Sequence, residues 1–506
     1  MFTPTLEEVK ELSGSYNLIP ITYSFLADQA TPIQIYQTIR GENTFLLESV
    51  EDGNRWGRYS FIGLNPFLRF RAKNNNYEVN YRNGLKEQGT GNPIDALKDK
   101  LSYYHIPRLI NLPPFAGGAV GFLGYDTVRY VEELPNNVED DQQLDTLHLL
   151  FVDELIAYDH LRQEVKVIVN IHIPENLDAG EINRLYDEAG RRVMALVKRI
   201  TEPGNQKQQR IENIPLHGEL PEFESNLTKK EFCSNVNKAK EYITAGDIFQ
   251  VVLSQRLSTT TEVDPLLVYR ILRVTNPSPY MYYFETDGMT VAGTSPEMLV
   301  KVTGDKVETR PIAGTRPRGR TEEEDLSLAE ELLADEKERA EHIMLVDLGR
   351  NDVGRVSQYG SVNVDEQMVI ELYSRVMHIV SHVSGKLKDG ISRFDALLSC
   401  FPAGTLSGSP KIRAMEIIDE LENKNRGVYG GAIGYFSFQG NLDSCITIRT
   451  IVFKGNKAYV QAGAGIVADS VPELEYEETV NKAKAMLIAL GIAEKMNQKE
   501  EMSLDV

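Results

Sequence analysis

The sequence predicts an α+β fold in which large antiparallel sheets are packed with helices on the outside. Runs of β-branched and aromatic residues are separated by short glycine-bearing turns, as in hairpins. Helical patterns come in separate blocks and do not alternate with single strands, so a parallel βαβ sheet is not expected. The chain has 506 residues, 42% hydrophobic and 25% charged, which is enough for two or more domains or one large one.

The first 200 residues mix strand-like and helical segments, and a polar stretch follows them. This stretch contains Pro215, Gly218 and Pro221 and has no apolar face, which is typical of a linker. The expected elements are strands at 44–50 and 165–173 and a helix at 179–200. The predicted divisions are an N-terminal part over 1–200, a linker over 201–227, a main part over 228–495 and a tail over 496–506.

The main part begins with a helix at 229–245 that Gly246 is expected to end. Its further predicted helices are at 322–347, 394–400, 409–422 and 476–490. Its predicted strands are at 249–257, 280–285, 298–303, 428–438, 446–453 and 457–462.

Composition excludes several classes of function. A net charge of −20 argues against nucleic-acid binding and against a polybasic membrane anchor. No apolar run reaches the roughly 18 residues that span a bilayer, and the first residues lack the pattern of a signal peptide. Three widely spaced cysteines suit a reducing compartment, so a cytoplasmic protein is expected.

Two pairs of carboxylates have the spacing of one helix face. Glu338 and Glu341 are three residues apart, and so are Glu475 and Glu478. Mg²⁺ prefers oxygen ligands and often shares its coordination shell with an anionic substrate. The pairs therefore suggest a magnesium site, although two solvated acidic faces would give the same pattern in so acidic a chain.

Two further segments carry groups suited to an anionic substrate. Glu297, in the turn Thr-Ser-Pro-Glu, is either a general acid or a cap. Arg449 alternates with apolar residues in a predicted strand, where an inward-facing guanidinium would need an anion such as a substrate carboxylate. The glycines of the loop at 309–320 allow backbone N–H groups to approach an anion closely.

Two motif matches are rejected on geometry. His378 and His382 lie in a β-branched run, and on a strand they would be about 13 Å apart, too far to share a zinc ion. One of them is either catalytic or a hydrogen-bonded core histidine. The segment 463–468 fits a dinucleotide fingerprint, but Asp469 and Pro472 follow at once, so no helix opens there. These glycines are better suited to passing backbone beside a flat ligand.

The motifs become specific when they are taken together in order. They are TSPE, TRPIAGT, AEHIMLVDLGRND, VMHIVSHVSG, FPAGTLSGSPK, GVYGGAIGY, ITIRT, QAGAGIV and EYEETVNKA. This series resembles the chorismate-utilising enzymes, and among them the family of anthranilate synthase large subunits. The resemblance covers essentially the whole chain and implies the fold of these enzymes. It also implies the conversion of chorismate and ammonia to anthranilate and pyruvate, in tryptophan biosynthesis.

The resemblance implies a role for individual residues. Mg²⁺ would be held by Glu341 and Glu478, with Glu338 and Glu475 as outer or water-mediated ligands. The expected catalytic residues are Glu297, the acid for the C4 hydroxyl, and His378. Substrate contacts are expected from Gly314, Thr315, Thr405, Tyr429, Arg449, Gly463, Ala464 and Gly465, of which Tyr429 and Arg449 would hold the enolpyruvyl carboxylate.

Regulation and a partner are implied as well. A pocket for tryptophan as feedback inhibitor is expected from Glu48, Ser49, Pro277, Ser278, Tyr280 and Met281. None of the cysteines has the glycine-flanked context of a glutaminase nucleophile, so ammonia is expected from a separate glutamine amidotransferase subunit.

Two positions separate the relatives of this family. Aminodeoxychorismate synthases commonly carry a lysine nucleophile where this chain has Ala313, and isochorismate and salicylate synthases carry a lysine where it has Gln250. Both residues favour an external amine as nucleophile. The alternatives are component I of an aminodeoxychorismate synthase and a catalytically idle, tryptophan-sensing scaffold.

Overall fold

The computed structural model describes residues 1–51, 55–175, 177–202, 211, 214, 220–373 and 376–504. Most of the linker expected at 201–227 therefore lies outside the described residues. No helix in the described ranges is both long and apolar enough to cross a bilayer.

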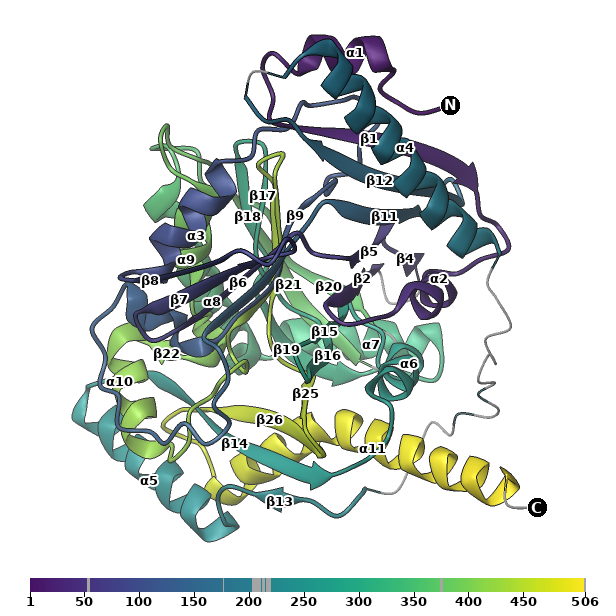
Figure 1. The fold of residues 1–506 in the computed structure, drawn as a ribbon. Coiled ribbons are helices and arrows are strands. Elements are labelled where there is room, and N and C mark those ends of the chain that lie inside the picture. Colours follow the sequence, from purple (N-terminus) through teal and green to yellow (C-terminus); the bar gives the residue numbers. More distant parts are fainter. Residues whose placement is uncertain are drawn as a thin grey trace.

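Two large antiparallel sheets form the centre of the molecule (Figure 1). The first sheet has the order β1 (Leu18–Leu26), β12 (Glu164–His172), β11 (Glu154–Asp159), β5 (Tyr59–Leu64), β2 (Thr44–Glu48), β15 (Tyr280–Thr286), β16 (Met289–Ser295), β25 (Thr450–Lys454), β26 (Lys457–Ile466), β14 (Gln250–Thr260) and β13 (Glu224–Ser225), with β22 (Gly408–Ser409) beside β14. The second has the order β19 (Ile312–Pro317), β21 (Val376–Lys386), β18 (Lys306–Thr309), β17 (Met298–Thr303), β24 (Leu442–Ile446), β23 (Ala432–Ser437), β9 (Gly118–Leu123), β10 (Leu147–Val152), β6 (Leu68–Lys73), β7 (Asn76–Tyr81) and β8 (Lys86–Thr90), with β20 (Asn363–Leu372) beside β21. A small hairpin joins β3 (Val50–Glu51) and β4 (Arg55–Trp56).

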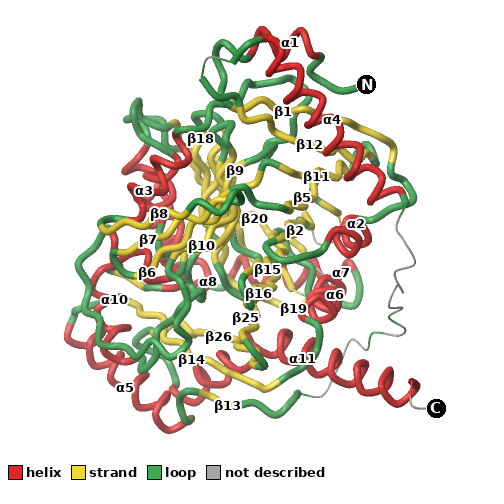
Figure 2. Tube along the Cα trace, in the orientation of Figure 1, coloured by secondary structure: helices red, strands yellow, loops and turns green. Residues whose placement is uncertain are grey.

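Helices cover the outer faces of both sheets, as Figure 2 shows by colour. They are α1 (Leu6–Leu12), α2 (Pro32–Ile39), α3 (Pro93–Ser102), α4 (Ala179–Thr201), α5 (Lys229–Ala245), α6 (Pro265–Thr275), α7 (Glu322–Ala334), α8 (Glu336–Val356), α9 (Arg393–Cys400), α10 (Lys411–Leu421) and α11 (Pro472–Leu504), with short 3₁₀ turns η1 (Tyr125–Tyr130) and η2 (Gly404–Leu406).

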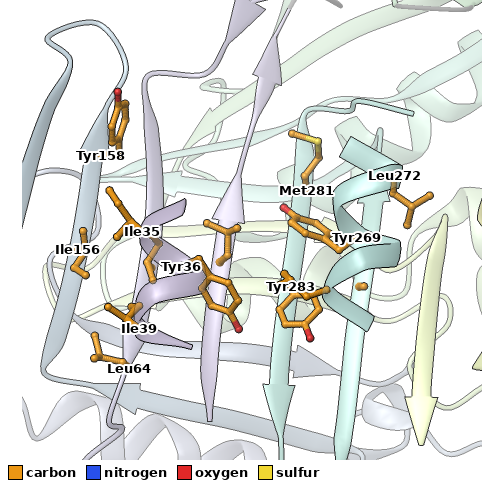
Figure 3. Close-up of a cluster of buried hydrophobic side chains, with 14 of the residues drawn as sticks. Ile35, Tyr36, Ile39, Leu64, Ile156, Tyr158, Tyr269, Leu272, Met281 and Tyr283 are labelled. Atoms are coloured by element: carbon orange, nitrogen blue, oxygen red, sulfur yellow. The ribbon is translucent and has the colours of Figure 1, made fainter. Parts of the chain in front are cut away.

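Alternating side chains separate an inner core from two outer ones. On β15, Tyr282 and Phe284 point into the core between the sheets, whereas Met281 and Tyr283 point to the helix-covered side. Figure 3 shows Met281 and Tyr283 beside Tyr269 of α6. This period of two is what an antiparallel sheet buried on both faces requires. The α+β fold with helices outside is therefore confirmed.

Both sheets contain strands from each side of the expected linker. β2 of the N-terminal part pairs with β15 of the main part, and β9 pairs with β23. The parts at 1–200 and 228–495 thus share their sheets and their inner core. The expected tail boundary at 496 falls within α11, which continues to Leu504.

Several predicted elements agree closely with the structure, and two predicted elements are each divided in it. The helix at 229–245 is confirmed, and Gly246 ends it with φ of 84°. The predicted helix 322–347 is wrong as one element, because Asp335 caps a new helix by accepting from the backbone N–H groups of Lys337 and Glu338. The predicted strand 446–453 is also wrong as one element, because a bend at 447–449 carries the chain from the second sheet to the first.

Candidate active site

The two acidic helices bring their glutamates into one electrostatic environment. Burial and the nearby carboxylates of Glu338 and Glu478 raise the pKa of Glu341, although Lys482 and Lys337 lower it. Burial and Glu478 likewise raise the pKa of Glu475. Since Glu341 lies on α8 and Glu478 on α11, the acidic faces of the two helices are turned toward each other, as the carboxylate spacing suggested.

Lys482 is a site residue that the sequence reasoning missed. Its Nζ lies 2.7 Å from a carboxylate oxygen of Glu478 and donates to the carbonyl of Gly463 at 3.0 Å. It also counteracts the rise in pKa of Glu297 and Glu341. The signal was available, because Lys482 follows Glu478 by four residues on a helix and therefore shares its face.

The glutamates fit a magnesium ion of the substrate-sharing kind. Within the described ranges, no three carboxylate, imidazole or thiol groups are close enough together to enclose a metal ion. Mg²⁺ does not need such an enclosure, since it keeps several waters and is commonly held by one or two carboxylates and the substrate. Glu341 supplies a partly buried carboxylate from α8, and Glu478 supplies an exposed one from α11. Glu338 lies 3.5 Å from Arg316.

Glu297 has the environment of a general acid. It follows β16 in a buried turn, and Thr405 of η2 donates a hydrogen bond to its carboxylate at 3.0 Å. Burial raises the pKa of Glu297 to about 7, although the Thr405 hydroxyl and Lys482 oppose the rise. A carboxyl group with this pKa is protonated in about half of the molecules at pH 7, where an exposed glutamate is almost fully ionised.

His378 projects from β21 beside the glycine loop of β19. Its Nδ1 lies 2.9 Å from the carbonyl oxygen of Gly314 and 3.1 Å from the hydroxyl of Thr315. Because a carbonyl can only accept, Nδ1 carries the proton, and Nε2 is the nitrogen left to accept one. Burial lowers the pKa of His378, so the ring is neutral in the resting site. His382 instead lies 3.2 Å from Glu308, and both histidines lie on one strand, β21, as predicted.

Arg449 is a buried cation of the site, and Tyr429 acts on its pKa. Arg449 lies in the bend between β24 and β25, and its guanidinium donates to the carbonyl of Lys482 at 3.0 Å. Burial lowers the pKa of Arg449, whereas Tyr429 and Glu478 raise it. A buried guanidinium of this kind favours an anionic partner, and its planar fork suits a carboxylate.

The glycines of β26 keep the opposite wall free of side chains. A Cβ at Gly463 would lie 2.8 Å from the hydroxyl of Tyr429, and one at Gly465 would lie 2.6 Å from the amide of Gln250. Ala464 points to the other face, where it is fully buried. All three lie inside β26, so the rejection of a dinucleotide turn is confirmed.

The residues expected to bind tryptophan lie together around the end of β2. Glu48 pairs with Met281 in the sheet, and the carbonyl of Ser278 accepts from the N–H of Val50 at 3.1 Å. Ser49 follows Glu48, and Pro277 lies in the turn before β15. Val50 and Met281 belong to the helix-covered outer core.

The side chains of Glu48 and Tyr280 already have polar partners within the protein. The carboxylate of Glu48 is fully buried, lies 2.6 Å from Arg273 and accepts from the hydroxyl of Tyr269 at 2.8 Å. Tyr280 points away from Glu48 into the inner core, where its hydroxyl donates to Asp443 at 3.0 Å. A ligand ammonium would therefore share Glu48 with Arg273, and Tyr280 can contribute only its backbone.

Comparisons with known proteins identify the family. A family model described as chorismate binding enzyme matches residues 42–488. Anthranilate synthase component 1 of Acetivibrio thermocellus is 54% identical over 97% of this chain and 99% of its own, and that of Aquifex aeolicus is 47% identical over 98% and 99%.

Solved structures show the same fold. The crystal structure of anthranilate synthase component I from Streptococcus pneumoniae TIGR4 has a TM-score of 0.76 and 38% identity, covering 92% of this chain and 99% of that one. The menaquinone-specific isochorismate synthase MenF of Escherichia coli shares the fold at 19% identity, with a TM-score of 0.69 over 96% and 99% of the two chains. The chain therefore belongs to the chorismate-binding enzymes, within the family of anthranilate synthase component 1 chains.

Proposed function

We propose that this chain converts chorismate and ammonia to anthranilate and pyruvate, as a magnesium-dependent lyase of tryptophan biosynthesis. The observation that carries the proposal is Glu297, a buried acid with a pKa of about 7. It lies in one site with two opposed carboxylates and a buried arginine, which suit a substrate bearing two carboxylates.

The residues divide the work of the first step. Arg449 and Tyr429 would hold the enolpyruvyl carboxylate. Glu341 and Glu478 would hold Mg²⁺, which would supply a counter-charge for the ring carboxylate. Glu297 donates its proton to the C4 hydroxyl as ammonia attacks C2, so a C–N bond forms, the C4–O bond breaks and water leaves. Holding both carboxylates fixes the ring against the acid.

The second step removes pyruvate. The C2 proton is lost and the bond between C3 and the ether oxygen breaks, which gives the aromatic product. The neutral ring of His378, with Nδ1 directed to the carbonyl of Gly314, offers Nε2 as a proton acceptor near the same ring.

The identity of two side chains supports an external nucleophile. Ala313 lies on β19, and Gln250 lies at the start of β14 with its amide beside Gly465. Neither side chain can act as the amine or activate water as a lysine would. Free ammonia is then the remaining nucleophile, which favours anthranilate synthase over aminodeoxychorismate synthase.

A separate glutamine amidotransferase would supply the ammonia. The three cysteines are free thiols. Burial raises the pKa of the Cys400 thiol to about 12 and raises that of Cys445, and burial also raises the pKa of Cys233. A nucleophilic cysteine needs a lowered pKa, so none of the three suits glutamine hydrolysis. Free thiols also suit the cytosol, where we place the protein.

The proposal includes feedback inhibition by tryptophan at the end of β2. Its support is the meeting of Glu48 and Ser49 with the segment 277–281, next to apolar side chains of α6. A carboxylate, backbone carbonyls and apolar walls suit an amino acid with an indole ring. The catalytically idle, tryptophan-sensing scaffold is disfavoured because the acid, the arginine and both acidic pairs are present.

The proposal that a separate subunit supplies the ammonia is tested by comparing ammonium with glutamine as the nitrogen source. The purified chain should form anthranilate from chorismate with ammonium but not with glutamine, and a glutamine amidotransferase partner should restore glutamine use. Cys233→Ala, Cys400→Ala and Cys445→Ala should each retain ammonium-dependent turnover. Glutamine-dependent synthesis by the isolated chain, free of contaminating glutaminase, would contradict the separate partner.

A further inference from the structure

Arg449 has a backbone conformation that a residue with a side chain rarely adopts. Its φ is 51°, in the left-handed region, within the bend between β24 and β25. Such a conformation persists only where the surrounding structure holds it. The direction of the guanidinium proposed to bind substrate therefore depends on the contacts that hold this bend.

One of these contacts comes from the end of β16. The backbone N–H of Thr294 donates to the carbonyl of Arg449 at 3.1 Å. The regular pairing of β16 with β25 ends one residue earlier, at Gly293 and Thr450. This hydrogen bond therefore fixes the strained residue itself rather than the strand that follows it.

The side chain of Thr294 is held in turn by Asn276. Thr294 is fully buried, and its hydroxyl accepts a hydrogen bond of 2.8 Å from the Asn276 amide. Asn276 is the C-cap of α6, and its own N–H donates to the carbonyl of Leu272. Two hydrogen bonds thus link the end of α6 to the backbone of Arg449.

The same end of α6 borders the segment proposed to bind tryptophan. Asn276 precedes Pro277 and Ser278, and the carbonyl of Ser278 accepts from the N–H of Val50. Helix α6 also carries Tyr269 and Arg273, which hold the carboxylate of Glu48. A shift of α6 or of the turn after it would therefore change the hydrogen bond to Thr294.

We propose that Asn276 and Thr294 are positioning residues for chorismate, and that their hydrogen bond transmits the state of the segment 276–281 to Arg449. This rests on the proposed function, in which Arg449 binds a substrate carboxylate. In the unliganded state the bond keeps the bend of Arg449 in its binding conformation. Displacement of Asn276 by a ligand at the end of β2 weakens that hold and lowers the affinity for chorismate.

The test uses the full chain with Asn276→Ala, Thr294→Val and the double variant. Each single variant should raise the KM and the Kd for chorismate about two- to tenfold, the equivalent of one hydrogen bond, with a smaller change in kcat. Each should also raise the half-inhibitory concentration of tryptophan. Because both residues act through one hydrogen bond, the chorismate KM and Kd of the double variant should not exceed those of the single variant with the larger effect.

Two controls separate positioning from packing. Thr290→Val changes a buried threonine four residues earlier on β16, opposite Phe453 and away from the bend, and should leave the chorismate KM unchanged. Thr294→Ser keeps the hydroxyl and should restore the wild-type KM. Thermal unfolding shows that each variant is folded, and Thr294→Ser together with Asn276→Ala tests the bond even if Thr294→Val fails to fold.

The proposal is overturned if Thr294→Val and Asn276→Ala lower only the melting temperature, leaving the chorismate KM and Kd at the values of Thr290→Val. It is also overturned if their effects on KM add in the double variant, since independent effects exclude a shared bond. Failure of the wild-type chain to form anthranilate would instead refute the proposed function. The chorismate Kd values, measured by calorimetry, would still test whether the hydrogen bond between Asn276 and Thr294 positions Arg449.

Discussion

The carboxyl group of Glu297 is the residue on which the proposed chemistry depends most. It is buried, and the Thr405 hydroxyl and Lys482 only partly offset the rise of its pKa to about 7. An acid so placed keeps a large protonated fraction at neutral pH, because the ionised form lacks solvation. The rate of the first step is therefore expected to depend on pH.

The rate of the first step should fall as the pH rises through about 7. The pKa of Glu297 is raised to about 7, so the protonated donor predominates below this pH and is lost above it. The measurement is kcat/KM for chorismate against pH at a constant concentration of free ammonia, so that titration of ammonium does not contribute. A profile that is flat from about pH 6 to about pH 8.5 would mean that another group is the acid.

Removing the acid should stop ammonia addition. Glu297→Gln is expected to lower kcat by roughly 100-fold or more, because an amide cannot donate a proton as a carboxylic acid does. Chorismate binding, followed by calorimetry, should persist. Glu308→Gln, on β18 and paired with Lys306 and His382, is a matched control that should keep near wild-type turnover. An unchanged rate in Glu297→Gln would remove this residue from the mechanism.

The metal assignment makes a separate prediction for the acidic helices. Glu341→Gln or Glu478→Gln should abolish turnover and weaken Mg²⁺ binding, since the substrate carboxylate loses its counter-charge. The fold should remain, as followed by circular dichroism. Glu477→Gln is the control, because Glu477 neighbours Glu478 on α11 but pairs with Lys229 of α5. Wild-type turnover at saturating Mg²⁺ in Glu341→Gln would exclude this site.

The spacing of the carboxylates predicted that each pair shares one helix face, because helix periodicity alone decides which side chains do so. Both pairs do lie on helices, Glu341 on α8 and Glu478 on α11. Lys482 follows the same periodicity, but a lysine on an acidic helix does not by itself indicate a site. Its place in the site is clear only from its hydrogen bond to the carbonyl of Gly463. The ion pair of Glu48 with Arg273 joins residues far apart in the chain, and no local pattern contains it.

At the scale of elements, the bend at Arg449 is the clearest departure from the sequence pattern. The alternation of Ile446 to Ile451 predicts one strand, but residues 447–449 are not in a strand. The chain changes sheets there, because β24 belongs to the second sheet and β25 to the first. A local pattern records which residues are buried but not which sheet buries them. Arg449 of the proposed site lies in this bend.

The end of β2 carries the prediction for feedback. Ser49→Phe should leave ammonium-dependent synthesis largely intact and relieve inhibition by tryptophan, because the added ring fills the space beside Glu48. The measurement is anthranilate formation against tryptophan concentration, with thermal unfolding as the control for folding. Unchanged inhibition would place the regulatory site elsewhere, and loss of folding would indicate that residues 46–50 serve only as a core strand.

At the scale of the whole molecule, the two sheets join the N-terminal part and the main part of the chain. β2 and β15 are neighbours in the first sheet, and β9 and β23 in the second, although the chain segments are remote. The composition of residues 201–227 indicated a boundary, since a polar stretch marks where the chain leaves the core. It could not show that the segments on either side return to the same sheets.

This architecture predicts that the main part does not fold alone. A chain starting at residue 228 would expose the edges of β15 and β23 and half of the inner core, so it should lack a cooperative thermal transition. Co-expression with residues 1–227 should restore chorismate binding. A fragment that unfolds cooperatively and binds chorismate without the N-terminal part would show that the two parts are independent domains.

The most direct test of the account is the product balance of a single reaction. The purified chain is mixed with chorismate, ammonium and Mg²⁺, anthranilate is followed by its fluorescence, and pyruvate is measured in the same sample. The account predicts that both products appear in equal amounts without a second lyase, and that removing Mg²⁺ with a chelator stops both. Accumulation of an aminated chorismate without pyruvate, or no turnover at all, would contradict it.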